Sequence, residues 1–413
     1  MNRRKTISVK VGDIFIGSDF PVRVQTMTNT DTNDIDGSVE QVKRCVAAGA
    51  ELVRFTTQGE KEVDNLAVIK QKLREQGINI PLVADVHFNA NVAIKAAQVV
   101  EKVRINPGNF FKNQEPRAKS QEEQEARHFD QREKSRLQSR FPANAQLEKP
   151  KENDNYELQT INYQLFTDFL NVCKKHNTAV RIGVNHGSLS ERILNRYGDT
   201  PEGMVESCME LLRICREENF DQIVISLKAS NTILMINAVR LLVEKMNAEN
   251  FYFPLHLGVT EAGDGEDGRI KSAIGIGALL IDGIGDTIRV SLAEAPENEI
   301  PTAFNILQAA RARITKTEYI ACPSCGRTLF DLQTTLQKVK AATSHLVGLK
   351  IAVMGCIVNG VGEMADADFG YVGAGKGRVS LYKGKTCVER NIPEEQAVEK
   401  LLEVIGDLVK VNS

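Results

Sequence analysis

Residues 51–87 read ELVRFTTQGEKEVDNLAVIKQKLREQGINIPLVADVH and contain the unit that repeats through much of the chain. The runs ELVRFT (51–56) and PLVADVH (81–87) are short, mostly apolar and rich in residues that favour strands. Between them, VDNLAVIKQKLREQG (63–77) places apolar residues at helical intervals and ends on glycine, which is typical of a helix end. The stretch therefore predicts a strand, a helix and a second strand.

Strand-like runs of this kind recur along the chain, with helix-like segments such as SVEQVKRCVAAG (38–49) and PEGMVESCMELLRICREENF (201–220) between them. Eight strand–helix units are the number found in a TIM (β/α)8 barrel. A doubly wound open sheet is the weaker alternative, because no Gly-x-Gly-x-x-Gly sequence follows the first strand. The predicted fold class is α/β, and the predicted barrel strands are 22–27, 51–56, 81–87, 102–106, 179–185, 222–228, 254–259 and 286–292.

The pattern changes near residue 316 and divides the chain into two predicted domains, a barrel over 1–315 and a smaller domain over 316–413. A chain of 413 residues is long enough for both. A helix at 329–345, a buried strand at 349–355, short strands around FGYVG and GRVSLYKG, and a final amphipathic helix from Pro393 indicate that the second domain is a small α/β domain.

Two further segments belong to the first domain. Residues 6–17, TISVKVGDIFIG, alternate on both sides of Gly12-Asp13 and predict a short β-hairpin. Residues 112–157 are mostly polar and carry many charges, so they are predicted to be a flexible surface insertion with some helix at 119–138. A catalytic lid is the weaker interpretation of this insertion.

Composition limits the function further. The net charge is −2 with 26% charged residues and no long basic stretch, which argues against general nucleic-acid binding. No apolar run is long enough to span a membrane, and the N-terminus shows no signal peptide. The eight scattered cysteines favour a reducing compartment, so we expect a cytoplasmic protein.

Three cysteines and a glutamate form the most specific motif. Cys322 and Cys325 lie in IACPSCGRT (320–328), and Cys356 lies in KIAVMGCIVNGVGE (350–363), a glycine-rich turn that ends at Glu363. Three thiolates and a more weakly held carboxylate suit a 4Fe-4S cluster with one exchangeable iron. The alternative is a structural zinc site with Cys387 as the fourth ligand.

Cations recur where the predicted strands end. In a TIM barrel these ends share one mouth, and residues two apart on a strand face the same way. Converging cations imply a polyanionic ligand, because an unpaired buried charge is costly and guanidinium groups suit phosphate oxygens. A diphosphate is therefore predicted, although the same cations would also fit outward-facing salt bridges. The pairs are Arg54 with Thr56, Arg104 with Asn106, Arg181 with Asn185, Lys228 with Ser230, and Arg289 with Ser291.

Acidic and imidazole groups accompany these cations. Asp85 and His87 end the third strand, and His186 follows the fifth. Glu261 precedes glycine-rich sequence that would give it access to the mouth, which suits a proton-transfer or substrate-orienting group. His256 lies between two leucines and is interpreted as a satisfied core residue. The remaining helical cysteines, predicted to be small core residues, are Cys45, Cys173, Cys208 and Cys215.

Taken together, these motifs resemble the 4-hydroxy-3-methylbut-2-enyl diphosphate synthase family, in the short two-domain form. The resemblance covers nearly the whole chain outside 112–157 and rests on VRINPGN (103–109), RIGVNHGSL (181–189), PLHLGVTEAG (254–263), GIGDTIRVSL (283–292), ACPSCGRT (321–328) and MGCIVNG (354–360). It implies an iron–sulfur enzyme of isoprenoid synthesis that opens 2-C-methyl-D-erythritol 2,4-cyclodiphosphate by two-electron reduction and dehydration. Ferredoxin or flavodoxin would supply the electrons, and the sequence does not choose between them.

The resemblance also implies roles for individual residues. Cys322, Cys325, Cys356 and Glu363 match the family's ligands to one 4Fe-4S cluster per subunit, and Asn185, Glu261 and Asn359 match residues near the reacting carbons, with Glu261 as the acid–base group. The matches to the diphosphate-binding positions are Arg54, Arg104, Arg181, Lys228, Arg289 and Ser291, and other expected pocket residues are Asp85, His87 and Asn106.

A homodimer is implied as well, because in the family the cluster domain of one subunit caps the barrel of the other.

One departure from the family pattern lies next to the expected cluster ligand Glu363. The usual turn is Asn-Gly-Pro-Gly-Glu, and this chain has Val361 in place of the proline. Valine leaves the turn freer than proline would, so the position of Glu363 could be affected.

Overall fold

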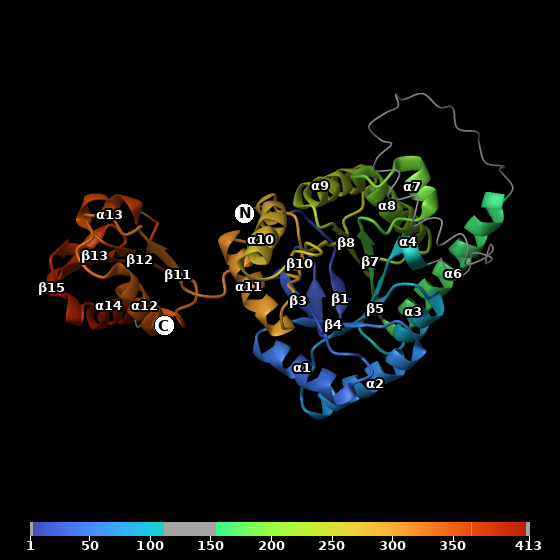
Figure 1. Cartoon of the computed structure of the whole chain (residues 1–413), viewed down its shortest axis with the longest axis horizontal. Helices are drawn as coiled ribbons and strands as arrows, with labels where there is room; N and C mark the ends of the chain where they lie inside the picture. The colour runs from blue at the N-terminus through green and yellow to red at the C-terminus, as the bar shows by residue number, and fades with distance from the viewer. Residues whose placement is uncertain (1–2, 111–153, 365, 410–413) are drawn as a thin grey trace, which may run out of the picture. The chain divides into compact units, whose positions relative to one another are not determined.

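The computed structural model describes the backbone of residues 3–110, 154–364 and 366–409, and within these ranges all side chains except those of 154–162, 359–361 and 407–409. The described chain forms two compact units, Met1–Ala312 and Arg313–Ser413 (Figure 1). The predicted surface insertion at 112–157 lies outside the described residues, apart from its last four, which begin a helix.

The first unit is a TIM barrel, as the sequence predicts. Its eight strands pair in parallel in the order β8-β7-β6-β5-β4-β3-β10-β9, and a bridge between Ile225 and Leu255 joins the two ends of this sheet. Each predicted strand is present. The strands are β3 (Arg23–Met27), β4 (Leu52–Thr56), β5 (Leu82–Val86), β6 (Lys102–Ile105), β7 (Ala179–Asn185), β8 (Ile223–Lys228), β9 (His256–Leu257) and β10 (Thr287–Ile288).

Helices surround the strands (Figure 1). Several begin where a polar side chain caps the first turn, as Asp34, Thr200 and Asn231 do by accepting a hydrogen bond from a backbone N–H. The helices of this unit are α1 (Ile35–Ala47), α2 (Glu60–Glu75), α3 (Ala90–Ala96), α4 (Pro107–Phe110), α6 (Asp154–His176), α7 (Glu191–Tyr197), α8 (Pro201–Glu217), α9 (Thr232–Ala248), α10 (Gly265–Ile281) and α11 (Pro296–Ala309).

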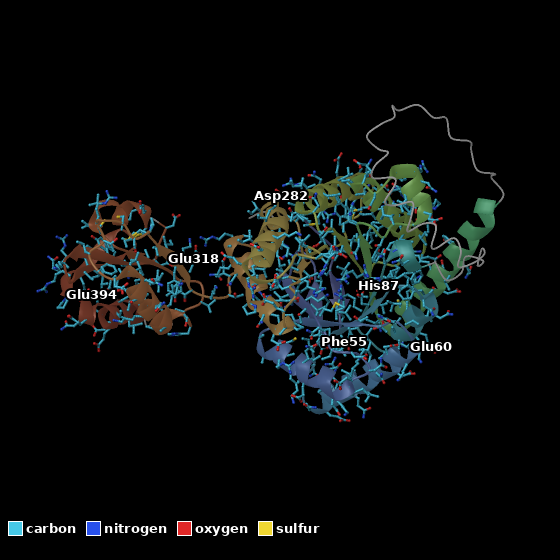
Figure 2. All side chains as sticks on the ribbon, viewed as in Figure 1. Phe55, Glu60, His87, Asp282, Glu318 and Glu394 are labelled. Atoms are coloured by element: carbon cyan, nitrogen blue, oxygen red, sulfur yellow. The ribbon has the colours of Figure 1, made fainter. Side chains whose placement is uncertain are left out.

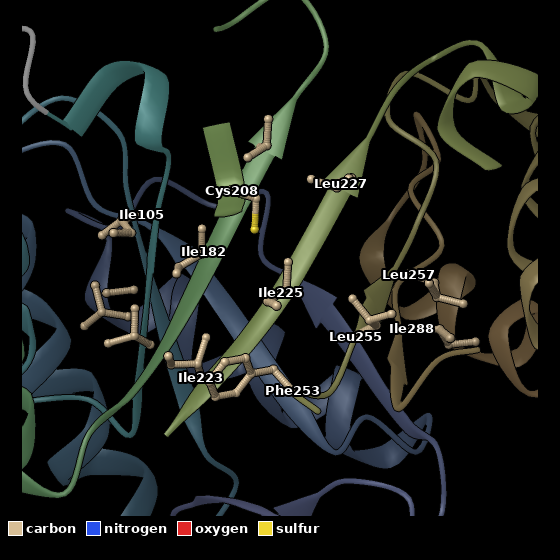
Figure 3. Packing of buried hydrophobic residues seen from close by; sticks show 14 of the residues in the cluster. Ile105, Ile182, Cys208, Ile223, Ile225, Leu227, Phe253, Leu255, Leu257 and Ile288 are labelled. Atoms are coloured by element: carbon tan, nitrogen blue, oxygen red, sulfur yellow. The ribbon is translucent and has the colours of Figure 1, made fainter. Parts of the chain in front are cut away.

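Apolar side chains fill the space between helices and strands. Figure 3 shows part of this layer, with Ile182 of β7, Ile225 of β8 and Cys208 of α8. The four helical cysteines predicted to be core residues, Cys45, Cys173, Cys208 and Cys215, are all fully buried. Burial raises the pKa of the Cys45 thiol to about 12, so this group stays a neutral, inert thiol.

The predicted hairpin closes one end of the barrel. Strands β1 (Val9–Val11) and β2 (Ile14–Ile16) pair in antiparallel fashion around a turn in which Gly12 has a φ of 60°. The buried side chains of the hairpin pack against a layer made by Leu52, Val83, Ala179 and Val224 near the amino ends of the barrel strands. This end is lined with apolar residues, whereas a polar cavity lies at the carboxyl ends of the strands.

The described residues of the second unit form a five-stranded mixed sheet and three helices. The predicted buried strand, central short strands and two long helices are present, but the sequence analysis missed both edge strands, β11 and β15. The elements are β11 (Glu318–Ala321), α12 (Leu332–Thr343), β12 (Lys350–Met354), α13 (Ile357–Glu363), β13 (Phe369–Gly375), β14 (Arg378–Lys383), β15 (Thr386–Pro393) and α14 (Glu394–Val409).

The segment from Ile357 to Glu363 differs from the prediction, because it forms the short helix α13 and not an open glycine-rich turn. Gly355 and Gly362 do not adopt the left-handed conformation that would bend the chain. Gly355 is needed for close packing, since a Cβ there would lie 2.9 Å from the side chain of Thr328. Among the described residues, no helix is long and apolar enough to cross a membrane.

Candidate active site

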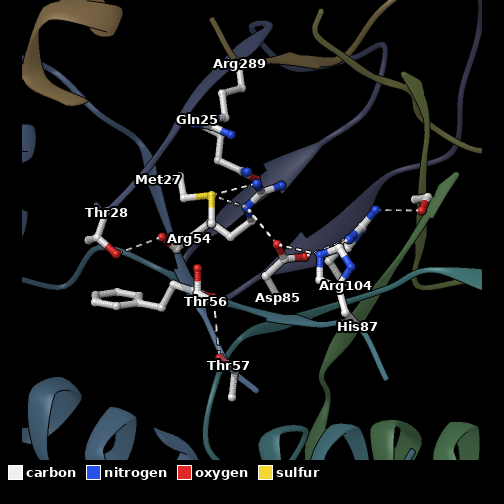
Figure 4. A network of polar contacts seen from close by, with 12 residues as sticks. Gln25, Met27, Thr28, Arg54, Thr56, Thr57, Asp85, His87, Arg104 and Arg289 are labelled. Atoms are coloured by element: carbon white, nitrogen blue, oxygen red, sulfur yellow. Dashed lines mark hydrogen bonds and ion pairs between the residues drawn. The ribbon is translucent and has the colours of Figure 1, made fainter. Parts of the chain in front are cut away.

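The carboxyl ends of the barrel strands bring the predicted cations together. Arg54, Asp85, Arg104 and Arg181 come from four neighbouring strands, and pairing places Asp85 beside Arg104 and Arg104 beside Arg181. Alternation along each strand turns all four side chains toward the barrel interior, where Figure 4 shows three of them converging. The apolar residues between them face the helices and fix this direction.

Asp85 is the centre of the polar network. It is 4% exposed; its carboxylate oxygens lie 3.1 Å from Arg104 Nη1, 3.6 Å from Arg54 Nε and 3.3 Å from His87 Nε2. Burial alone would raise the pKa of this carboxyl, but Arg54 and Arg104 outweigh burial and hold it well below its usual range. Asp85 is therefore ionised and fixes the orientation of both arginines.

Other cations in the mouth have weaker partners. Arg181 is 1% exposed, and in the part of the chain that the structure describes its Nε and Nη1 have no hydrogen-bond acceptor. Burial, and then Arg54 and Arg104, lower the pKa of Arg181. Arg289 lies 3.5 Å from Glu299, and burial lowers the pKa of Arg289 to about 10. Lys228 is 7% exposed, and burial and the neighbouring arginines lower its pKa well below the ordinary value. The mouth thus holds more positive than negative charge.

One cavity connects most of the predicted residues. Ser226 and Thr260 also line it and were not singled out from the sequence. Ser226 lies two residues before Lys228 on β8, so this spacing could have identified it, whereas no such spacing points to Thr260. Glu261 is exposed and has a φ of 53°, and Asn106 is fully buried and donates to Ser188 Oγ at 2.9 Å; neither lines the cavity. The lining residues are Arg54, Asp85, His87, Arg104, Arg181, Asn185, Ser226, Lys228, Thr260, Arg289 and Ser291.

His256 departs from its interpretation as a satisfied core residue. It is 1% exposed, and its Nδ1 lies 3.4 Å from the Thr287 hydroxyl, but its Nε2 has no hydrogen-bond partner among the described residues. Burial, and then Lys228, Arg181 and Lys102, lower the pKa of His256 well below its usual range. The sequence shows the two flanking leucines but not the polar interior that this side chain faces.

In the second unit, Cys322 and Cys356 follow the carboxyl ends of two neighbouring parallel strands, β11 and β12, which pair Ala321 with Val353. The backbone N–H of Gly355 donates to Cys322 Sγ at 3.1 Å and ties the two strand ends together. Cys325 is exposed, and a backbone hydrogen bond from Arg327 lowers the pKa of its thiol. Backbone donors directed at thiolates favour a metal or cluster site.

Other features of this unit bear on the cluster and zinc interpretations. Glu363 is exposed at the end of α13, while the side chains of Asn359 and Val361 lie outside the described residues. Cys387 of β15 directs its thiol to the Glu389 carbonyl at 3.4 Å. Within the described residues, no three His, Cys, Asp or Glu groups are positioned to hold a single metal ion. Three accessible thiols on one unit nevertheless suit an iron–sulfur cluster by donor type.

Comparison with known proteins identifies the family. The model of the GcpE TIM-barrel domain matches residues 6–304, and that of the GcpE protein C-terminal domain matches residues 318–407. The chain belongs to the GcpE family of 4-hydroxy-3-methylbut-2-en-1-yl diphosphate synthases. A relative in Prochlorococcus marinus, the ferredoxin-type 4-hydroxy-3-methylbut-2-en-1-yl diphosphate synthase, is 51% identical over 410 residues, covering 98% of this chain and 93% of the relative.

A second relative is longer. The flavodoxin-type synthase of Parabacteroides distasonis is 39% identical over 627 aligned positions, covering 98% of this chain and 98% of the relative. That alignment exceeds the 413 residues of this chain, so it opens long gaps here. Among solved structures, an N-acetylneuraminic acid synthetase from Leptospira borgpetersenii is 11% identical with a TM-score of 0.44 over 75% of this chain and 90% of that one.

The Asp85 network generates a stability prediction. Asp85→Asn leaves Arg54 and Arg104 without their shared counter-charge, so we expect the free energy of unfolding at pH 7 to fall by about 3–5 kcal/mol. The exposed pair between Asp36 and Lys72 provides a control, since Asp36→Asn should cost less than about 1 kcal/mol. Denaturant unfolding measures both changes, and equal small losses would contradict the central role of Asp85.

The same network sets a pH dependence. Because the pKa of Asp85 is depressed in the folded state, its stabilisation is present above the ordinary aspartate pKa of about 3.9 and is lost as the pH falls through the lower folded-state value. The gap in stability between the protein and Asp85→Asn should therefore shrink as the pH falls below about 4.

Proposed function

We propose that this chain catalyses the two-electron reductive ring opening and dehydration of 2-C-methyl-D-erythritol 2,4-cyclodiphosphate to 4-hydroxy-3-methylbut-2-enyl diphosphate. The observation that supports this most directly is the set of buried cations that share one cavity at the barrel mouth. The family of the chain supplies the chemical context for that cavity. The alternative of a non-redox barrel with a structural zinc tail lacks such support, because the relatives are named as synthases.

The barrel residues would bind the diphosphate. Arg181 offers two unpartnered guanidinium nitrogens inside the cavity, and Arg289 offers its Nε, each counted over the described residues. Phosphate oxygens satisfy such donors and neutralise the excess charge, which lowers the cost of keeping the cations buried. In this proposal Arg54, Arg104, Lys228 and Ser291 complete the diphosphate site, and Asp85 and His87 orient Arg104.

The second unit would hold the redox centre. We assign Cys322, Cys325, Cys356 and Glu363 as ligands of one 4Fe-4S cluster per subunit, in keeping with a family that uses an iron–sulfur cluster. Such a cluster supplies single electrons and a Lewis-acidic iron. Gly355 N–H, which already donates to Cys322 Sγ, would stabilise the thiolate form of that ligand. The donor is ferredoxin or flavodoxin, as in the names of the relatives.

Three further residues are assigned to the reacting carbons. Asn185 ends β7 and lines the cavity, so its amide can orient the carbon skeleton of the substrate. Glu261 is exposed next to the cavity-lining Thr260 and would hold or release the proton for the departing water. Asn359 is assigned from the family pattern alone.

We further propose that the enzyme is a cytoplasmic homodimer in which the cluster unit of one subunit serves the barrel of the other. Helix α10 offers an apolar face for contact between subunits: Ile270, Ile274 and Ile281 are 50%, 56% and 64% exposed, and a Cβ at Gly277 would meet no atom within 4 Å. Figure 2 shows Asp282, which follows α10, at the edge of the barrel.

The α10 face is self-complementary in sequence. Its residues follow at intervals of four, three and four, so an antiparallel twofold pair would place Ile270 on Ile281 of the partner subunit and Ile274 over Gly277 of the partner subunit. The same symmetry would bring Lys271 and Asp282 of the partner subunit to one edge of the contact, where their charges are complementary. The occupant of this face is therefore a second copy of the chain.

The decisive test of the proposed function is anaerobic reconstitution with iron and sulfide, followed by assay on the cyclic diphosphate with a chemical reductant. Formation of the open-chain diphosphate supports the proposal. A colourless protein that binds zinc and releases no such product would reject it.

The ligand assignment makes a prediction. Cys322→Ser, Cys325→Ser and Cys356→Ser should each abolish the visible iron–sulfur absorbance and the activity, because each removes one thiolate from an iron. Cys387→Ser is the matched control and should retain both, since its thiol is directed to the Glu389 carbonyl. Loss of the metal in Cys387→Ser, with retention in Glu363→Ala, would contradict the ligand set.

The diphosphate site makes another. Arg181→Ala and Arg289→Ala should each weaken substrate binding by about 1.5–3 kcal/mol, the range for a lost charge-assisted hydrogen bond. The cluster absorbance should not change, because both residues lie on the barrel unit. Unaltered Michaelis constants in both variants would argue against a diphosphate at the strand ends.

The subunit contact is tested by Ile274→Asp. A carboxylate on the α10 face should convert the dimer to monomers in sedimentation velocity and reduce activity. Val68→Asp on α2, which changes a residue 40% exposed, is the control and should leave the dimer intact. A protein that stays dimeric with Ile274→Asp would place the contact elsewhere.

A further inference from the structure

Lys102 is a buried amine that the proposed reaction does not use. It begins β6, is fully buried, and donates to Gln25 Oε1 at 3.2 Å. Within the described residues, no carboxylate pairs with it. Pairing across the sheet places Lys102 beside Val83 and Ala179. Each of these residues lies two positions before Arg104, Asp85 or Arg181 on its strand, nearer the amino end of the barrel. Lys102 thus lies about 6–7 Å deeper in the barrel than the diphosphate site.

The charged and titratable groups around Lys102 are mostly positive. The positive charges of Arg181 on β7 and Arg54 on β4 lower the pKa of Lys102, and the charge of Lys102 in turn lowers the pKa of His256 on β9. Arg104, two residues along its own strand, is paired with Asp85 of β5, and Glu299 is paired with Arg289, so both of these carboxylates are already engaged. The remaining cations of the mouth are Lys228 of β8 and Arg289 of β10.

Gln25 is the hydrogen-bond partner of Lys102. Its side chain is 1% exposed and accepts from Lys102, while its Nε2 has no acceptor among the described residues. An amide oxygen is a sufficient partner for a neutral amine but a weak one for a buried ammonium. The surroundings of Lys102 therefore suit an uncharged side chain as long as nothing negative occupies the mouth.

We infer that Lys102 is a positioning residue that is uncharged in the ligand-free barrel and takes up a proton when the cyclic diphosphate binds. Its new positive charge then adds to that of Arg181 in attracting the bound dianion. This inference rests on the proposed function. The proton comes from solvent and binds the lone pair of Lys102 Nζ, and no other bond forms or breaks. Burial, and then Arg181 and Arg54, lower the pKa of Lys102 well below its ordinary value, in agreement with the geometry.

The sign of the pH effect follows. A bound dianion raises the pKa of Lys102, so affinity should increase as the pH falls through the interval between the bound-state and free-state values. One proton taken up changes affinity by at most about tenfold per pH unit. The ligand does not contribute to this change near neutral pH, because each phosphorus of a cyclic diphosphate carries only one strongly acidic hydroxyl.

The test is calorimetric titration of the anaerobic, oxidised holoenzyme with the cyclic diphosphate, in two buffers that differ in ionisation enthalpy. The difference in heat gives the number of protons taken up. We expect uptake by the parent protein, and an uptake smaller by up to one proton per site in Lys102→Met, which matches lysine in length but cannot titrate. Lys228 and His256 can also take up protons, so a second variant that keeps Lys102 is needed to assign the difference to Lys102.

A second variant should reduce the proton uptake by keeping Lys102 protonated before the ligand binds. Gln25→Glu puts a carboxylate beside Lys102 and keeps the amine protonated before binding, so it should also reduce the uptake although the lysine remains. The parent's steeper affinity dependence on pH should flatten in both variants. A purely structural role for Lys102 would leave proton uptake unchanged.

Two results would overturn the inference. Equal uptake by the parent, Lys102→Met and Gln25→Glu would show that Lys102 does not titrate on binding, while the proposed function would stand. Absence of any binding of the cyclic diphosphate by the parent would reject both the proposed function and this inference.

Discussion

The barrel depends on one imbalance of charge. Asp85 is a carboxylate held among arginines from neighbouring strands, and it neutralises only part of their charge. Arg181 and Lys228 lie in the same cavity without a carboxylate partner among the described residues. Both are buried to a degree at which an unpaired charged side chain is rarely found. An arrangement of this kind costs stability in the free protein, and the cost is lowest when a dianion is bound.

The rest of the barrel unit holds these cations in position. The hairpin of β1 and β2 covers the amino ends of the strands with apolar side chains, and the polar cavity lies at the opposite end. Outward-facing apolar residues such as Ile182 and Ile225 pack under the helices and hold each strand in the register that aligns Arg104 with Arg181. In the second unit, the pairing of β11 with β12 performs the equivalent task for Cys322 and Cys356.

The sequence predicts the eight barrel strands because buried parallel strands read as short apolar runs, and it predicts the cations at their ends because those interrupt the runs. It does not single out Lys102, which begins the predicted strand 102–106, although alternation with Arg104 turns Lys102 inward as well. It also misses β15, whose exposed edge position gives no apolar pattern. The helix α13 was mistaken for a turn because it contains two glycines, Gly360 and Gly362, although Gly362 does not adopt the left-handed conformation typical of a turn.

We propose that the barrel mouth alone provides the diphosphate site and that the cysteines provide the redox centre. Equilibrium binding of 2-C-methyl-D-erythritol 2,4-cyclodiphosphate to the Cys322→Ser protein, which lacks a complete ligand set, tests it most directly. We expect binding of one molecule per chain, with an affinity that falls as the salt concentration is raised. A folded Cys322→Ser protein that binds none of the cyclic diphosphate, beside a parent protein that does, would contradict it.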